Sequence, residues 1–229
     1  MSQETTEAME TEITLNEHAV TAALSRRHLL MGGAATGLAL AAAACGGAND
    51  TTEATRDDPK KVEPSPAAVA DLDVVEFAAG LEVLAVGTYK AALDAATANK
   101  LGPVPPAVAE FVKTAMSHHQ EHLDALNGAL RTGLRDEVNQ PNAKLKPTVD
   151  AEFAKVKDVA GAANLALMLE TIAADTYLAA LPKLNSDDGK KLAASIQAVD
   201  QQHRSILLFA LGQYPVPETF HNPDQAATA

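Results

Sequence analysis

Apolar residues recur at steps of three and four along four long stretches of the chain, and this spacing predicts four long helices. In the first stretch, Val74, Ala78, Leu81 and Ala85 follow one another at these steps. Clusters rich in proline and glycine, such as "LGPVPPAV", interrupt the pattern. The predicted helices cover about residues 67 to 99, 106 to 132, 148 to 181 and 186 to 211.

The connections between these predicted helices differ in length. The first and second helices are joined by a short segment, as are the third and fourth, so each pair should form an antiparallel hairpin. Segment 133–147, "GLRDEVNQPNAKLKP", can cross the bundle, because an extended chain spans up to ~3.3 Å per residue. The sequence therefore predicts an all-α four-helix bundle over residues 67–212, with two hairpins joined by a long crossover.

The first and third predicted helices contain nearly the same sequence. "LEVLAVGTYKAAL" begins at residue 81 and "LETIAADTYLAAL" at residue 169, and they agree at eight of thirteen positions. Glu82 and Tyr89 are seven residues apart and share a helix face, as do Glu170 and Tyr177. Because the chain has only three tyrosines, the repeated Glu and Tyr indicate an internal duplication.

The second and fourth predicted helices carry histidines at helical spacing. In "SHHQEHLDAL", His122 follows His119 by three residues and His118 by four, so either pair can share a face. In "AVDQQHRSIL", Asp200 and His203 are also three apart. If His122 corresponds to His203, then His119 corresponds to Asp200, and the duplication covers both hairpins.

These polar residues are expected to meet near the middle of the bundle. Glu82 precedes the first hairpin turn by about as many residues as His122 follows it, and each residue adds ~1.5 Å of helix. Glu170, Asp200 and His203 agree in depth within about one turn of the second hairpin. Because unpaired polar groups are costly in an apolar core, a bound metal is the simplest way to satisfy them.

This combination resembles the ferritin-like di-metal carboxylate bundles, in which two helices give one Glu each and the other two give an acid-x-x-His pair each. It is most similar to the exported ferritin-like-domain lipoproteins of bacteria, whose second helix often has a His-His-x-x-His stretch. The resemblance covers residues 67–212 and implies a transition-metal site at mid-bundle. The metal ligands that it implies are Glu82, His119, His122, Glu170, Asp200 and His203.

Two of these positions depart from the family pattern. His119 stands where the bridging Glu of the family normally stands, and Asp200 is one methylene shorter than Glu. The site is therefore richer in histidine, which leaves room for a single metal or a softer one. Iron is the favoured cofactor, with copper, zinc or manganese as alternatives.

Two functions of different classes follow from this pattern. The resemblance implies a metal-binding protein whose activity, if it has one, is oxidation of iron or disposal of peroxide. The competing hypothesis is a metal-free helical-bundle adaptor or structural cell-envelope protein, in which Glu82 and Glu170 remain as a buried polar network.

The first 45 residues are interpreted as a targeting segment. "SRRHLL" contains Arg26 and Arg27 and resembles a twin-arginine signal, and the apolar run after it ends in "AAAAC", which resembles a lipobox at Cys45. The protein is then expected to be exported and lipid-anchored to the outer face of the cytoplasmic membrane, in the cell envelope. An uncleaved N-terminal membrane anchor is the alternative. Residues 46–66 would form a tether, and residues 213–229 an irregular tail.

Composition narrows the partners. The net charge of −12 argues against nucleic acid, because binding phosphates needs a basic face. A single cysteine excludes an intrachain disulfide. Contact with the membrane through the N-terminal lipid is expected. A homodimer is compatible with the sequence, and no other protein partner can be identified from it.

Other polar residues are expected to have structural roles. Tyr89 and Tyr177 should pack in the core with their hydroxyls bonded to carboxylates. His118 should be a flanking or solvent residue. Asp175, where the first copy of the repeat has glycine, should be solvated or interhelical, and His221 is assigned no role at the site.

Overall fold

A computed structural model describes residues 63–228, and the structural statements below concern that range. The order of elements is α2 (Pro66–Ala70), α3 (Leu72–Thr97), α4 (Pro106–Thr132), α5 (Lys146–Phe153), α6 (Val159–Ala180), the short 3-10 helix η1 (Leu181–Lys183) and α7 (Asp187–Ala210). No strand occurs among these described residues. The all-α prediction is confirmed.

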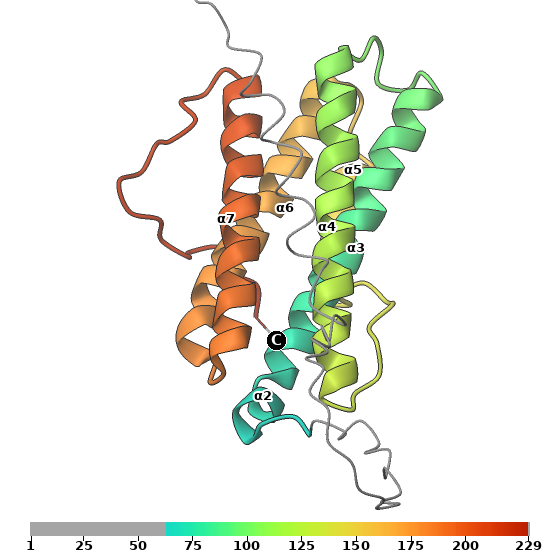
Figure 1. Cartoon of the computed structure of the whole chain (residues 1–229). Coiled ribbons are helices and arrows are strands. Elements are labelled where there is room, and N and C mark those ends of the chain that lie inside the picture. Colours follow the sequence, from blue (N-terminus) through green and yellow to red (C-terminus); the bar gives the residue numbers. More distant parts are fainter. Residues whose placement is uncertain (1–62, 229) are drawn as a thin grey trace, which may run out of the picture. The chain divides into compact units, whose positions relative to one another are not determined.

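The four long helices form two hairpins. Helix α3 packs along α4, α6 packs along α7, and α3 also contacts α6 (Figure 1). The segment between α4 and α5 crosses α3 where Asn142 N donates a 2.8 Å hydrogen bond to Gly80 O. The Asn127 side chain fixes the start of this crossover through bonds to both backbone groups of Val138. These contacts confirm the predicted topology.

Polar side chains fix the helix ends near the second hairpin turn. Ser186 caps α7, since its Oγ accepts a 3.0 Å bond from Gly189 N. Asp71, at the junction of α2 and α3, accepts four hydrogen bonds from Asn185 and Ser186. Burial raises the pKa of Asp71, but the bonds from Ser186 and Asn185 lower it more. Asp71 thus ties the start of the first hairpin to the turn of the second.

The third predicted helix, residues 148–181, is not continuous. Asp158 has an extended backbone (φ −153°, ψ 177°), and its side chain accepts a 2.7 Å bond from Gly161 N, so a new helix begins there. Before this break, α5 buries Val149 against Leu84 of α3 and neighbouring apolar residues. The predicted first helix is likewise interrupted, at Asp71.

Along the bundle, apolar and polar layers alternate. Leu123, Leu126 and Leu130 of α4 pack into a core with residues of α3, α6 and α7. On α4, the predicted ligands His119 and His122 come before these leucines. An apolar cavity lies beyond the ligands, toward the start of α4. The helical stretch Val159–Lys183 is long and apolar enough to span a membrane, but 44% of its apolar window is buried inside the bundle. We interpret α6 as a core helix, because it packs along α7, contacts α3 and α5, and buries Glu170 and Tyr177.

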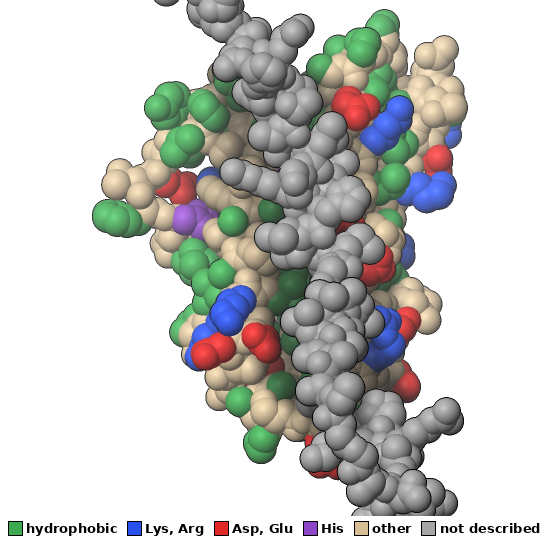
Figure 2. Space-filling view, viewed as in Figure 1, with side chains coloured by type: hydrophobic (Ala, Val, Ile, Leu, Met, Phe, Trp, Pro, Cys, Tyr) green, Lys and Arg blue, Asp and Glu red, His purple; other side chains and the backbone are tan. Residues whose placement is uncertain are grey.

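The visible surface mixes charges of both signs. Figure 2 shows acidic and basic side chains lying beside one another, between apolar areas. Ion pairs between neighbouring residues, such as Lys146 with Asp150 at 2.5 Å, account for several of the basic groups. These pairs are exposed and contribute little to stability.

Candidate metal centre

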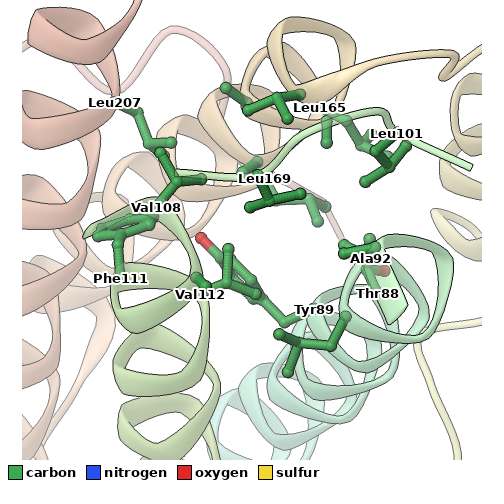
Figure 3. A pocket seen from close by; sticks show the side chains of 18 of the residues that line it. Thr88, Tyr89, Ala92, Leu101, Val108, Phe111, Val112, Leu165, Leu169 and Leu207 are labelled. Carbon is green, nitrogen blue, oxygen red and sulfur yellow. The ribbon is translucent and has the colours of Figure 1, made fainter. Parts of the chain in front are cut away.

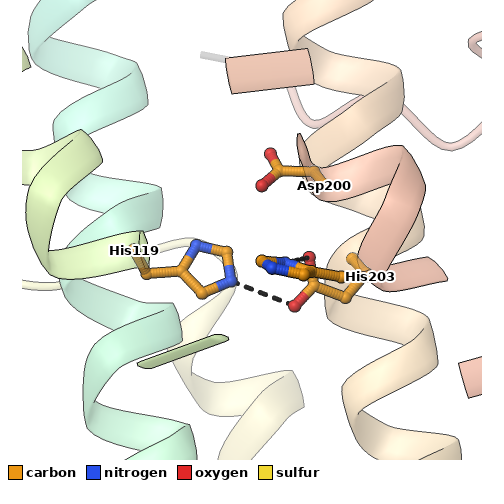
Figure 4. A group of neighbouring side chains, drawn as sticks. His119, Asp200 and His203 are labelled. Atoms are coloured by element: carbon orange, nitrogen blue, oxygen red, sulfur yellow. Dashed lines mark hydrogen bonds and ion pairs between the residues drawn. The ribbon is translucent and has the colours of Figure 1, made fainter. Parts of the chain in front are cut away.

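The structure brings all six predicted ligands together from four helices. Five of them are buried, and His122 is slightly exposed, with 12% of its side chain accessible. Figure 4 shows His119 reaching from one hairpin toward Asp200 and His203 of the other. The six side chains are Glu82 of α3, His119 and His122 of α4, Glu170 of α6, and Asp200 and His203 of α7.

The two tyrosines of the repeat bond to the carboxylates in a crossed pattern. Tyr89 of α3 donates to Glu170 Oε1 of α6, and Tyr177 of α6 donates to Glu82 Oε1 of α3, both at 2.5 Å. Each half of the duplication therefore holds the glutamate of the other half. The prediction that the tyrosine hydroxyls bond to buried carboxylates is confirmed.

His119 lies between the two glutamates. Its Nδ1 is 2.8 Å from Glu82 Oε2, and its Nε2 is 3.0 Å from Glu170 Oε1. Because an ionised carboxylate only accepts hydrogen bonds, both ring nitrogens must donate, which requires an imidazolium. Burial lowers the pKa of His119, but Glu170 and Glu82 raise it well above its usual range. The positively charged imidazolium of His119 thus lies between the two carboxylates.

The same contacts act on the glutamates in the opposite direction. Burial raises the pKa of each carboxyl, but hydrogen bonding and charge interaction with His119 lower the pKa of Glu82 and of Glu170 to about 2. Both side chains are therefore ionised across the physiological range. Two buried carboxylates and one imidazolium leave net negative charge in this layer.

Asp200 and His122 are not satisfied by the protein. Both oxygens of Asp200 and the Nδ1 of His122 are buried without a hydrogen-bond partner. His122 Nδ1 lies 3.7 Å from Glu82 Oε2 and 3.8 Å from Asp200 Oδ1, which is too long for hydrogen bonds. Burial, followed by the charge of Glu82, raises the pKa of Asp200 well above its usual range. Such orphaned groups are rare in native cores and call for a ligand.

His203 is held from two sides. Its Nδ1 is 3.2 Å from Glu170 Oε2, and its Nε2 is 3.0 Å from His118 Nδ1, with the two rings stacked 5.2 Å apart. His118 thus flanks the centre, as expected, and is half-buried against one of the predicted ligands. The spacing of four between His118 and His122 could have indicated that both face the bundle.

The C-terminal tail contacts α6, which the sequence did not predict. Asp175 is buried; its Oδ2 accepts a 2.7 Å bond from Gln225 N, and its Oδ1 lies 2.8 Å from His221 Nε2. Thr176 Oγ1 accepts a 2.8 Å bond from Ala227 N. Asp175 is thus neither solvated nor interhelical. His221 is not among the grouped ligands and lies beside Asp175 and Glu218.

The donor set fits a transition metal. Two groups have ligand atoms within 4.8 Å of one another: His119, Glu170, Asp200 and His203 in one, and Glu82, His119 and His122 in the other. Two atoms bound to one ion at ~2.0–2.2 Å each can lie up to about 4.4 Å apart, so the 3.7 Å and 3.8 Å separations around His122 suit a shared cation. Imidazole together with carboxylate suits iron, manganese, zinc and copper alike, so the donors do not select one metal.

A comparison with protein families agrees with this architecture. The ferritin-like domain matches residues 70–213, which is more than half of the chain. The chain belongs to the ferritin-like domain family. A search of curated proteins finds no match. The predicted signal residues Arg26 and Arg27 and the predicted lipidation site Cys45 lie outside the described residues.

Proposed function

We propose that this ferritin-like protein binds a transition metal at mid-bundle and acts outside the cytoplasmic membrane. One observation carries the metal proposal: Asp200 and His122 present three buried ligand atoms without hydrogen-bond partners, facing an ionised Glu82. A cation satisfies all three at once, whereas no protein donor or acceptor reaches them.

The surrounding residues have separate tasks in this proposal. Glu82, His122 and Asp200 would hold the ion, since His122 Nδ1 lies 3.7 Å from Glu82 and 3.8 Å from Asp200. Glu170 and His203, which are grouped with Asp200, would extend the site on the α6–α7 side. A redox-active metal there would supply one-electron chemistry suited to oxidising iron or disposing of peroxide. The protein contributes a buried site with fixed ligands, since each glutamate is oriented by the tyrosine of the other half.

His119 makes metal binding sensitive to protons. Its imidazolium already neutralises part of the charge of Glu82 and Glu170. A dication drawn to the same carboxylates competes with the proton on His119. Metal uptake should therefore release protons, and metal affinity should rise with pH.

A second candidate rests on the same histidine. Because His119 bridges both glutamates, the centre retains a satisfied polar network without metal, as a metal-free adaptor would. The unsatisfied Asp200 opposes this alternative, because an adaptor gains nothing from a buried, unpaired carboxyl group.

Metal analysis separates the two candidates. The full-length protein, purified without an affinity tag and stripped with a chelator, would be reconstituted separately with iron, manganese, zinc and copper. We expect at least one ion per chain for one of these metals, weakened in Asp200→Asn and unchanged in Glu121→Gln, an exposed neighbour of His122. Substoichiometric binding of all four metals would exclude the metal proposal and leave the adaptor.

The proposed location has its own test. Arg26, Arg27 and Cys45 support twin-arginine export and lipidation by their spacing in the sequence alone. We expect Cys45→Ala to lose incorporated fatty acid and to leave the membrane fraction, and Arg26→Lys with Arg27→Lys to block export. If Cys45→Ala stays in the membrane, an uncleaved anchor replaces the lipid.

A further inference from the structure

A separate cavity lies beside the metal centre, at the end of the bundle where α3 ends and α4 begins. Its volume is about 70 Å³. It is lined by residues of α3, α4 and α6, with Phe153 and Leu207 adding to its wall. Many of these side chains are partly exposed to solvent, so the cavity opens to the surface. Figure 3 shows aliphatic and aromatic side chains converging on this space, among them Val108, Phe111, Val112, Leu165 and Leu169.

The wall offers no free hydrogen-bonding side chain. Only two lining residues, Thr88 and Tyr89, carry hydroxyl groups. Thr88 Oγ1 donates to Leu84 O at 2.8 Å, and the Tyr89 hydroxyl donates to Glu170 at 2.5 Å. A water molecule needs two to four polar partners to remain in a cavity, so this space favours a non-polar occupant.

Small residues keep the space open. Ala92 and Ala96 of α3, Ala109 of α4, and Ala163 and Ala166 of α6 all line it. The short side chains on three helices thus leave an apolar hollow between them.

The cavity adjoins the centre through two aromatic rings. Tyr89 lines it with its ring and holds Glu170 with its hydroxyl. Phe111 also lines it, with its ring edge-on to Tyr89 at 6.5 Å and to His203 at 5.9 Å between centroids. An occupant would therefore touch the rings that pack against the ligands, without touching the proposed metal ligands themselves.

We infer that this cavity is a binding site for a small, uncharged, non-polar molecule. Its volume is about half of the 150 Å³ that holds benzene or xenon in an engineered apolar cavity, which limits the occupant to the size of a dissolved gas or one of the shortest hydrocarbons. The inference does not depend on a bound metal, because none of the proposed metal ligands lines the cavity.

Xenon is the probe for this site. The full chain would be titrated with xenon and followed by ¹²⁹Xe NMR, and crystals would be pressurised with xenon to locate the atom. We expect saturable binding, in both metal-free and metal-loaded protein, with xenon against Tyr89 and Phe111. Titrations with methane and benzene define the size limit: methane should compete with xenon, and benzene should not.

Two variants from different helices fill the space. We expect Ala92→Leu and Ala109→Leu each to abolish saturable xenon binding while helicity by circular dichroism and metal content stay as in the parent. Ala125→Leu, on the exposed face of α4, is the matched control and should bind xenon normally. Absence of saturable xenon binding by the parent protein, or its persistence in both filled variants, would overturn the inference. Competition by benzene would overturn the size limit.

Discussion

The two hairpins repeat the same Glu and Tyr on their first helices but differ on their second helices. Glu82 and Glu170 occupy equivalent positions, and each accepts a hydrogen bond from a tyrosine of the other half. On the second helix of each hairpin the halves differ: His119 is bonded through both ring nitrogens, whereas Asp200 has no partner for either oxygen. The repeated Glu and Tyr residues thus form a common framework, and the difference between His119 and Asp200 creates the unsatisfied site.

The largest expected effect comes from removing one glutamate. Glu170 accepts from Tyr89, His119 and His203 within 3.2 Å, so Glu170→Leu leaves the His119 cation with one counter-charge. We expect metal-free Glu170→Leu to lose about 3–5 kcal/mol of unfolding free energy, the usual cost of breaking a buried ion pair. Urea denaturation followed by circular dichroism measures this loss.

Two controls sharpen this comparison of the halves. Glu82→Leu should lose somewhat less, because Glu82 has only two partners within 3.2 Å, Tyr177 and His119. Glu110→Leu, on the exposed surface of α4, should be nearly neutral. A loss in Glu170→Leu no greater than that in Glu110→Leu would contradict the ionic network.

Acid should destabilise the metal-free protein through the same two carboxylates. Their folded-state pKa of about 2 lies below the ordinary value of 4.5, so their contribution to stability is complete above pH 4.5 and is lost as pH falls toward 2. Asp200 acts in the opposite direction, because its raised pKa means that its protonation favours the folded state. Urea midpoints measured from about pH 5 to about pH 2 should fall, and fall less steeply in Glu170→Leu. Parallel pH profiles would contradict the assignment.

The crossed tyrosines test whether the duplication is energetically symmetric. Tyr89→Phe and Tyr177→Phe each remove one hydrogen bond to a buried, charged carboxylate at the same distance. We expect each variant to lose about 1.5–3 kcal/mol of unfolding free energy, in nearly equal amounts. Tyr214→Phe, in the exposed tail, is the control and should change nothing. Strongly unequal losses would show that the two halves hold their glutamates differently.

Local pattern predicted most of this arrangement. The spacing of seven between Glu82 and Tyr89, repeated at Glu170 and Tyr177, was enough to place four side chains in one layer, because helical registry converts sequence distance directly into direction. The histidines of α4 and α7 followed from the same registry. What the sequence could not give was the crossed pairing, which depends on how the two hairpins face each other.

Features set by capping or by distant contacts escaped prediction. The break before α6 depends on one polar residue, Asp158. Its side chain accepts a hydrogen bond from the backbone of the next helix, which competes with continuing the preceding helix through this position. The tail contact joins Asp175 to Gln225 and His221 across a large sequence separation, so no local period marks it. Asp71 is similar, since its four bonds reach the turn of the other hairpin.

Replacing the orphaned carboxyl should separate stability from metal binding. Asp200→Asn keeps the shape of the side chain and removes its ionisation, which burial and the nearby glutamates oppose. We expect the metal-free variant to be more stable by about 1–2 kcal/mol, as often occurs when a strained functional group is neutralised. Its metal affinity should fall at least tenfold, typical of losing one ligand or its support. If Asp200→Asn is destabilised without metal, the carboxylate has a structural role instead.

The smallest expected effect concerns one of the five positions at which the two copies of the repeat differ, Gly87 in α3 and Asp175 in α6. Asp175→Ala removes the acceptor for Gln225 N and the partner of His221, so the tail should detach from α6 at a cost of about 1 kcal/mol. Limited proteolysis should then cleave the tail faster, and the Gln225 amide should lose protection from hydrogen exchange. Gly87→Ala is the matched control at the equivalent position, since a Cβ there meets nothing within 4 Å. Unchanged cleavage in Asp175→Ala would mean that the bond from Ala227 N to Thr176 holds the tail by itself, and that Asp175 does not contribute to holding it.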